Sequence, residues 1–229
     1  MPEDTEKDLK EWFDFEIKRG HYTTPDDDYF KKEYEKRWIC IHNTAGTTLS
    51  GAVQTLNKED YIAVPYCIDW DGTIYEMYNP RYWAWHLGVK GKKGYYDKHS
   101  IGIEIVNPGP LVKAANGHMN FWPQNYGARY CDVSDTSHYY KKTFRGKDYY
   151  ATYTEEQYKS AGLLCFYLAA LFDIPLHLRT NLEYDLNGVY EKDGIIGHHH
   201  IRKDKYDPSP AFDWKRFKKY LGHSSVTEE

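Results

Sequence analysis

The chain has 229 residues, enough for one domain with a sizeable core. Hydrophobic residues make up 41% and charged residues 28%, as in ordinary globular proteins; the high aromatic share of 17% suits either a large core or a wet binding groove. The net charge of −4 excludes the global basic field of nucleic-acid-binding proteins, so we expect no nucleic-acid partner.

The sequence offers neither a membrane span nor an export signal. No apolar run approaches the ~20 residues that cross a bilayer. The acidic opening "MPEDTEKDLK" lacks the charged-then-apolar order of a signal peptide, so we expect synthesis in the cytoplasm without ordinary export. The four cysteines show no CxxC pairing, and Cys40, Cys67 and Cys165 lie in apolar segments; this pattern predicts buried thiols and disfavours a zinc ribbon.

The N-terminal part predicts a helical extension over residues 1–36. Leu9, Trp12, Phe13 and Ile17 recur at helical spacing, which predicts an amphipathic helix over residues 4–20. The segment "GHYTTPDDD" ends it, and a second short helix is expected through "YFKKEYEK" at residues 29–36.

The next segments alternate strands with a helix. The apolar run at residues 38–41 predicts a buried strand that ends at His42, and residues 48–57 suit a helix. Residues 63–78 read as two strands around the turn signal Asp71-Gly72. Residues 100–107 predict another strand, with alternate residues on its two faces: Ile101, Ile103 and Ile105 on one, Gly102, Glu104 and Val106 on the other.

Residues 108–150 have no clear periodicity and form a predicted insertion. A long irregular segment in a compact domain is uncommon and is often functional. Its aromatic residues predict either a wall over glycan or peptide or a small cluster of their own: Phe121, Trp122, Tyr126, Tyr130, Tyr139 and Tyr140.

The C-terminal part contains the clearest helix, over residues 153–174, with a capping box from Thr154 to Gln157 and Pro175 after its end. Residues 194–200 predict a short strand that runs into a loop, residues 210–221 a last helix, and residues 222–229 a flexible tail. The alternation of strands and helices predicts a single α/β domain with a central mixed sheet flanked by helices.

Polar residues gather where predicted strands end, at His42, Glu104 and the run His198–His200. An open α/β sheet usually carries its site there. A catalytic zinc ion takes three protein ligands and one open position, and two histidines with a carboxylate meet that need. Taken alone, His42 is more often a structural histidine, a run of three histidines is usually a polar surface loop, and Asp207 before Pro208 suits a turn or helix cap.

Five motifs in order resemble a known family. They are "IHNTA" (41–45), "CIDWDGTIYEM" (67–77), "WAWHLG" (83–88), "SIGIEIVN" (100–107) and "GHHHIRKDKYDPSPAFDW" (197–214). The set resembles the zinc-dependent N-acetylmuramoyl-L-alanine amidases of type 2, whose fold peptidoglycan recognition proteins and small phage lysozymes share. The resemblance implies an amidase domain over residues 37–221, interrupted by the insertion.

The resemblance also implies one Zn²⁺ per chain, held by His42, His198 and Asp207. His198 is selected because the family's ligand directly follows a glycine, here Gly197. Strand alternation would place His198 and His200 on one face and His199 on the other, so it does not by itself separate His198 from His200.

The remaining site residues are implied in the same way. Glu104 matches the family's general base, and Lys205 matches a lysine that stabilises the oxyanion. His86 matches a histidine beside the substrate cleft. We predict further substrate contacts from three aromatic or polar neighbours of these motifs: Asn43, Trp85 and Tyr66.

The chain departs from the family pattern at several positions. Asn43 stands where a second histidine is frequent, and Pro65 occupies another frequent histidine position. Some members use a tyrosine in place of the glutamate, and Tyr66 is adjacent to that position but displaced. The stretch between His198 and Asp207 is about one residue shorter than in many members. These departures affect the assignment of roles to the residues around the metal, and not the prediction that zinc binds.

The predicted function is hydrolysis of the amide between N-acetylmuramic acid and L-alanine in peptidoglycan, by a monomeric, bacteriolytic, endolysin-like enzyme. The expected partners are bacterial peptidoglycan or muropeptides. Four alternatives stay open: a non-catalytic peptidoglycan-binding module, a cytosolic muropeptide-recycling amidase, a toxin injected into neighbouring cells, and a zinc amidohydrolase for a different amide.

Overall fold

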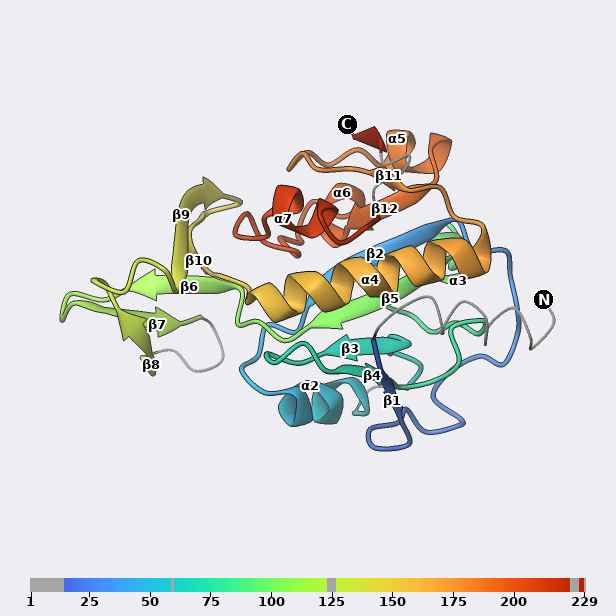
Figure 1. Cartoon of the computed structure of the whole chain (residues 1–229), viewed down its shortest axis with the longest axis horizontal. Helices are drawn as coiled ribbons and strands as arrows, with labels where there is room; N and C mark the ends of the chain where they lie inside the picture. The colour runs from blue at the N-terminus through green and yellow to red at the C-terminus, as the bar shows by residue number, and fades with distance from the viewer. Residues whose placement is uncertain (1–14, 59, 123–126, 223–226, 229) are drawn as a thin grey trace.

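The computed structural model describes residues 15–58, 60–122, 127–222 and 227–228. An eight-stranded mixed sheet forms the centre, and a smaller sheet projects from one end of it (Figure 1). The central strand order is β1-β4-β3-β5-β2-β12-β11-β13. The strands are β1 (Ile17–Arg19), β2 (Trp38–Asn43), β3 (Tyr66–Ile68), β4 (Ile74–Glu76), β5 (Ser100–Ile105), β11 (His177–Leu178), β12 (Gly194–Gly197) and β13 (Thr227–Glu228).

The central strands β2 and β5 run parallel and in register, from Trp38 opposite Ser100 to Asn43 opposite Ile105. Nearly all of their residues are buried, because other elements cover both faces of the sheet. Strands β3 and β4 pair antiparallel around the predicted Asp71-Gly72 turn, which is confirmed. The mixed α/β fold with a central sheet is therefore the one that the sequence predicts.

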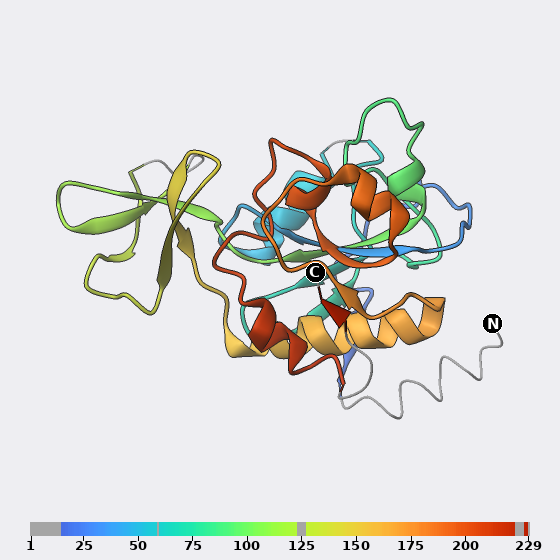
Figure 2. The same cartoon turned by 90° about the horizontal axis from the view of Figure 1, so that it is seen from above.

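The long helix α4 (Glu155–Phe172) covers one face of the sheet together with α7 (Trp214–Lys218) (Figure 2). Its start is the predicted capping box, in which Thr154 accepts from Gln157 and Gln157 accepts from Thr154. The remaining helices are α2 (Leu49–Leu56), α3 (Tyr95–Lys98), α5 (Leu186–Glu191) and α6 (His198–Ile201). Helices α2, α3 and α6 lie on the opposite side of the sheet from α4 (Figures 1 and 2).

The core on the α4 side consists of one face of the strands and the apolar stripe of the helix. Ile41, Ile103 and Ile105 are fully buried against Leu164 and Leu168. Side chains at the alternate strand positions, such as His42 and Glu104, therefore point to the opposite face. All four cysteines are free and buried, which confirms the prediction for Cys40, Cys67 and Cys165; Cys131 is not part of that prediction.

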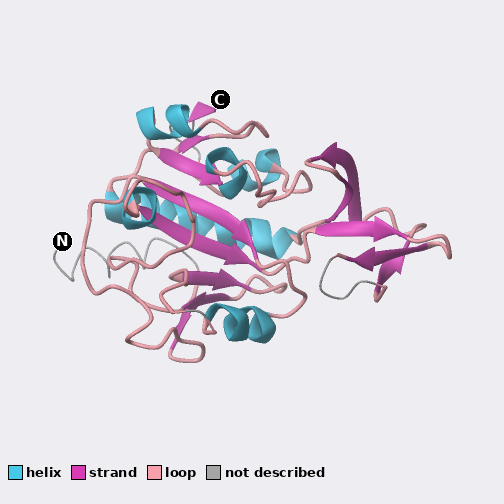
Figure 3. Cartoon of the chain, turned by 180° about the vertical axis from the view of Figure 1, so that it is seen from behind, coloured by secondary structure: helices cyan, strands magenta, loops and turns pink. Residues whose placement is uncertain are grey.

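The insertion folds into a sheet of its own, visible as a separate group of strands in Figure 3. Its antiparallel order is β8-β7-β6-β10-β9, with a small core of Leu111, Met119, Cys131 and Ala151. Hydrophobic alternation does not reveal these strands, because most of their side chains are exposed or half-buried; β9 has no buried residue. The strands are β6 (Pro110–Lys113), β7 (His118–Phe121), β8 (Arg129–Asp132), β9 (Tyr139–Phe144) and β10 (Lys147–Ala151).

The predicted N-terminal helices are wrong in the residues that the structure describes. Residues 1–14 lie outside those residues, but Ile17–Arg19 forms β1, which adds to the sheet beside β4. The unpaired edge of β4 and the Arg19–Glu76 ion pair, at 2.9 Å, outweigh the helical spacing. No helix forms over residues 29–36, where Phe30 stacks on Trp83 with ring centroids 4.1 Å apart.

The last predicted helix is shorter than expected. Helix α7 begins after Asp213, whose carboxylate accepts from the backbone N–H groups of Lys215 and Arg216. Residues 210–213 precede it as a turn. Among the described helices, none combines the length and the apolar character that crossing a membrane requires.

Candidate metal centre and active site

Three potential metal ligands converge where β2 and β12 end. Strand β12 pairs with β2 so that Gly197 lies opposite Ile41, which places His198 beside His42. Asp207 returns to the same point after the loop that follows α6. The Nδ1 atoms of His42 and His198 are 3.0 Å apart, and Asp207 Oδ2 lies 3.0 Å from the first and 3.1 Å from the second. All three residues are buried.

Hydrogen bonds behind His198 fix which ring nitrogen faces the cluster. His198 Nε2 lies 3.0 Å from the Leu87 carbonyl, which only accepts, so Nε2 carries the proton. Its Nδ1 lone pair is therefore free to bind a cation. Asp97 holds this carbonyl in place, because its Oδ1 accepts from the backbone N–H groups of His86 at 2.9 Å and Leu87 at 2.8 Å.

His42 has a comparable support on its far side. Its Nε2 lies 3.0 Å from His86 Nδ1, and His86 Nε2 lies 2.8 Å from Ser100 Oγ. Gly102 makes this contact possible, since a Cβ there would lie 2.9 Å from His86 Nδ1. These two contacts orient the rings of His42 and His86.

The charges in the cluster suit a divalent cation. Burial lowers the pKa of His42 to about 4, so its imidazole is neutral near pH 7. Burial alone would raise the pKa of Asp207, but electrostatic attraction and hydrogen bonding to His198 and His42 hold it well below its usual range. Two imidazole nitrogens and one carboxylate oxygen are a donor set that zinc commonly takes. The residues present therefore fit the predicted ion.

Glu104 lies beside this cluster, opposite His42 in the register of β5 and β2. It lines the same cavity, of about 290 Å³, as all three potential ligands. Its Oε2 is buried and has no hydrogen-bond partner among the described residues. Burial, and then the negative charge of Asp207, raise the pKa of Glu104 to about 8. A carboxyl in this state can exchange a proton with a molecule that enters the cavity.

Lys205 and Asn43 also line the cavity, as does His86. The positive charge of Lys205 lowers the pKa of both Glu104 and His42, so its ammonium acts on the centre of the site. Asn43 is buried, and its amide donates to the Tyr153 hydroxyl at 3.3 Å. It holds the end of β2 as well as facing the cavity.

The other two predicted substrate contacts are not brought to the cavity. Tyr66 pairs in register with Ile103, so it faces the α4 side, where its hydroxyl donates to Glu76 at 3.1 Å. Trp85 packs edge-on against Trp83, with centroids 5.1 Å apart, and does not line the cavity. Sequence reasoning missed Asp97, whose position two residues before His99 carried no motif.

The alternation predicted for the three histidines does not apply, because residues 198–201 form the helical turn α6. His199 and His200 both turn away from the cluster, toward the carbonyl of Asn181, at 3.2 Å and 2.9 Å. His200 Nδ1 accepts from the Gly197 N–H at 2.8 Å. Of the run, only His198 faces His42 and Asp207.

The burial of these neutral imidazoles predicts acid sensitivity of the metal-free protein. Burial lowers the pKa of His199 to about 4 and that of His200 well below 6.5. Between pH 6.5 and 4 the unfolded chain binds protons that the folded chain does not, so stability falls as the pH falls. Glu104, with its raised pKa, acts in the opposite direction between pH 8 and 4.5, but the neutral imidazoles of His42, His199 and His200 outnumber it.

We therefore expect the free energy of unfolding in urea to decrease from pH 6.5 to pH 4. Each net proton contributes about 1.4 kcal/mol per pH unit. In His199→Gln, whose amide does not titrate, this slope should be smaller by about one proton. An unchanged slope in His199→Gln would contradict the assignment.

The aromatic residues of the insertion divide between two places. Phe121 and Tyr130 pack on each other inside the small sheet, and Tyr139 donates to the Val133 carbonyl at 2.7 Å. Trp122 lies edge-on to Tyr206, which lines the cavity, with centroids 6.5 Å apart. Tyr126 lies outside the described residues. Tyr140 is exposed and lines a different groove. Three of the six predicted wall residues thus belong to a cluster of their own, and one, Trp122, approaches the cavity.

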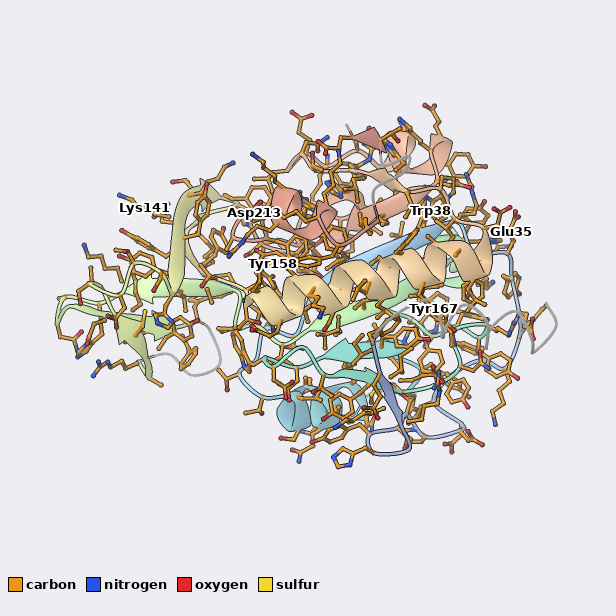
Figure 4. All side chains as sticks on the ribbon, viewed as in Figure 1. Glu35, Trp38, Lys141, Tyr158, Tyr167 and Asp213 are labelled. Carbon is orange, nitrogen blue, oxygen red and sulfur yellow. The ribbon has the colours of Figure 1, made fainter. Side chains whose placement is uncertain are left out.

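A larger groove, of about 800 Å³, shares no lining residue with this cavity. It lies by α7 and the start of α4, where Tyr158 and Asp213 are labelled in Figure 4. The Asp213 backbone N–H donates to the Tyr158 hydroxyl at 2.8 Å.

The sequence profile of the N-acetylmuramoyl-L-alanine amidases of type 2 matches residues 33–210, more than half of the chain. The chain belongs to this amidase family. The matched range includes His42, His198 and Asp207 as well as the insertion. A search of curated protein sequences finds no match.

Solved structures share the fold of this amidase-family chain at low sequence identity. A selenomethionine derivative of AmpD superposes with a TM-score of 0.51 at 17% identity, covering 90% of this chain and 95% of its own. AmiD from E. coli, in complex with a muropeptide substrate, has a TM-score of 0.53 at 19% identity over 83% of this chain and 59% of its own. The catalytic domain of XlyA has a TM-score of 0.51 at 17% identity, over 91% and 100%.

Proposed function

We propose that the protein hydrolyses the amide between the lactyl group of N-acetylmuramic acid and L-alanine in peptidoglycan. The observation that carries this proposal is the convergence of His42, His198 and Asp207 beside the unpartnered carboxyl of Glu104, in one cavity. Membership in the amidase family supports the choice of this amide as the bond that is cleaved.

The three converging residues would hold one Zn²⁺. A zinc ion there supplies Lewis-acid polarisation of the scissile carbonyl and acidifies water. The family and the donor set support this cofactor.

Residues of the chain carry out the proton transfer and stabilise the charge that develops. Glu104 accepts a proton from the attacking water and passes it to the leaving amine of L-alanine. A nearby dication would stabilise the charged form of Glu104 and so lower its pKa from the value that burial sets. Lys205 places a positive charge where the carbonyl oxygen becomes negative, a contribution whose loss typically costs ~10²–10³ in rate. His86 and Asp97 keep the two imidazoles oriented through the hydrogen bonds described above.

Metal removal separates this proposal from a non-catalytic peptidoglycan-binding module. We expect close to one zinc per chain in protein purified without chelator. Removal of the ion should abolish hydrolysis, and stoichiometric zinc should restore it. Metal analysis with an activity assay on purified peptidoglycan measures both. Protein that lacks zinc but still binds peptidoglycan would support the binding module instead.

The proposed amidase activity has two candidate substrates that differ in size, the intact cell wall and soluble muropeptides. We propose lysis of the intact cell wall as the main activity. The substrate named for the AmiD complex, an anhydro-muropeptide, favours a recycling activity as the second candidate. Mass spectrometry of products from intact sacculi, compared with soluble anhydro-muropeptides at equal enzyme concentration, decides between them. Faster turnover of the soluble substrate would reject the lytic role.

A further inference from the structure

The insertion is attached to the amidase core at two separate points. At its base, Asn107 donates to the carbonyls of Ala151 and Thr152, at 3.3 Å and 2.9 Å, and accepts from the Gly109 N–H at 2.7 Å. At its far side, the β9–β10 hairpin rises toward the C-terminal part of the chain (Figure 1). The insertion is therefore not a free appendage, and the second contact needs an explanation.

That second contact is made by Arg145, at the tip of the hairpin. Its guanidinium donates to the carbonyl of Arg202 at 2.7 Å, to that of His199 at 2.9 Å, and to that of Lys205. All three carbonyls belong to the stretch between His198 and Asp207. Only the His199 carbonyl belongs to the helical turn α6, and the other two follow it; a planar cation with several donors is well suited to gather all three.

The hairpin is built to present this side chain. Arg145 and Gly146 connect β9 to β10 and both have positive φ, 48° and 76°, as a two-residue turn of type I′ requires. Asn, Asp or Gly is usual at the first of these positions. Here the arginine is half-buried, and its guanidinium lies 4.8 Å from the ring centroid of Phe144, which in turn packs edge-on against His199.

The loop that Arg145 holds carries two residues of the proposed site. Lys205 is bonded through its own carbonyl, and Asp207 follows two residues later. Asp207 is tied back to the start of the loop, because its carbonyl accepts from the His199 N–H at 3.0 Å. A displacement of the loop at residues 199–205 would therefore move the Lys205 ammonium and the Asp207 carboxylate relative to His42 and Glu104, which lie on the sheet.

We propose that the insertion acts as a clamp on the loop of residues 199–207, and that Arg145 is the positioning residue that fixes Lys205 and Asp207 in the active site. This inference rests on the proposed amidase function. It gives the insertion a role in catalysis that does not depend on contact with the substrate.

The test compares Arg145→Ala and Arg145→Lys with Lys142→Ala. Lys142 is exposed on β9, the strand that leads to Arg145. Its replacement removes one positive charge from the same hairpin and leaves the hydrogen bonds to residues 199–205 in place. In Arg145→Ala we expect zinc to be released to a chelator about 10–100-fold faster, in line with the loss of groups that orient metal ligands. The kcat on peptidoglycan should fall by about tenfold or more, with KM within about twofold, because the loop carries catalytic groups.

The lysine variant separates positioning from overall stability. A lysine ammonium reaches one or two of the carbonyls but not all three in a fixed geometry, so Arg145→Lys should lie between wild type and Arg145→Ala in both zinc release and kcat. Lys142→Ala should match wild type. Zinc release and kcat in Arg145→Ala equal to those of Lys142→Ala would overturn the clamp, as would a loss expressed only in KM.

Hydrogen exchange gives a readout that does not require activity. Amides of the 199–207 segment should exchange faster in Arg145→Ala than in Lys142→Ala, while those of β2 and β5 remain unchanged. If wild-type protein neither binds zinc nor cleaves muropeptides, the proposed function fails, and the exchange result still decides on the clamp. Equal exchange of the segment in the two variants would reject it.

Discussion

Replacement of Glu104 by glutamine or alanine is expected to lower kcat on purified peptidoglycan by ~10²–10⁴, the usual contribution of a general acid–base residue. Glu104 is not one of the three converging ligand residues, so the variants should keep close to one zinc per chain. The physical reason for the loss is that no other described carboxyl lines the cavity except Asp204 and the proposed ligand Asp207. Product release measured by mass spectrometry, together with metal analysis, checks both statements.

Two further measurements make this prediction specific. Glu156→Gln, an exposed change on α4, should retain wild-type activity and serves as the matched control. Because Glu104 Oε2 is buried without a hydrogen-bond partner, Glu104→Gln should unfold at the same temperature as wild type or a higher one. Full activity of Glu104→Ala would remove Glu104 from the mechanism.

The second large effect is expected at His198. Loss of groups that merely orient ligands typically costs 10–100-fold in metal affinity, so His198→Ala, which removes a proposed ligand, should weaken zinc binding by more than ~100-fold. Activity should fall with zinc occupancy. Competition with a chromogenic chelator measures the affinity, and circular dichroism verifies that the variant is folded.

His200→Ala is the matched comparison, two residues away and equally buried. It removes hydrogen bonds to Gly197 and Asn181, so it should destabilise the fold by about 1–3 kcal/mol while the zinc affinity of the folded protein stays near that of wild type. If zinc were lost in His200→Ala and kept in His198→Ala, the ligand assignment would be wrong.

The elements predicted well from sequence are those whose signals are local. The apolar run of β2, the Asp71-Gly72 turn and the Thr154 capping box each depend on a few adjacent residues, and the structure confirms them. The strand alternation of residues 100–107 also placed Glu104 on the face away from the apolar core. The convergence of His42 with His198 and Asp207 required family resemblance, because it is a contact across more than 150 residues.

The elements predicted badly depend on partners distant in sequence. Ile17–Arg19 forms a strand because β4 offers a free edge, and no pattern within residues 15–20 indicates this. The strands of the insertion pair with one another and bury only a few side chains fully, so hydrophobic alternation is weak. Tyr66 was placed by its nearness to a motif, whereas its register with Ile103 turns it to the other face.

The in-register pairing of β2 with β5 has a consequence for how this enzyme can change. His42 and Glu104 occupy opposite positions on neighbouring strands, so their spacing is set by the ~4.8 Å repeat between strands and by two buried backbones. His198 is joined to Asp207 through the stretch of residues 199–206, which is not part of the sheet. The site thus consists of a rigid half and an adjustable half. Insertions, deletions and redesign can alter the adjustable half, while the distance between the proposed ligand His42 and the proposed base Glu104 is preserved.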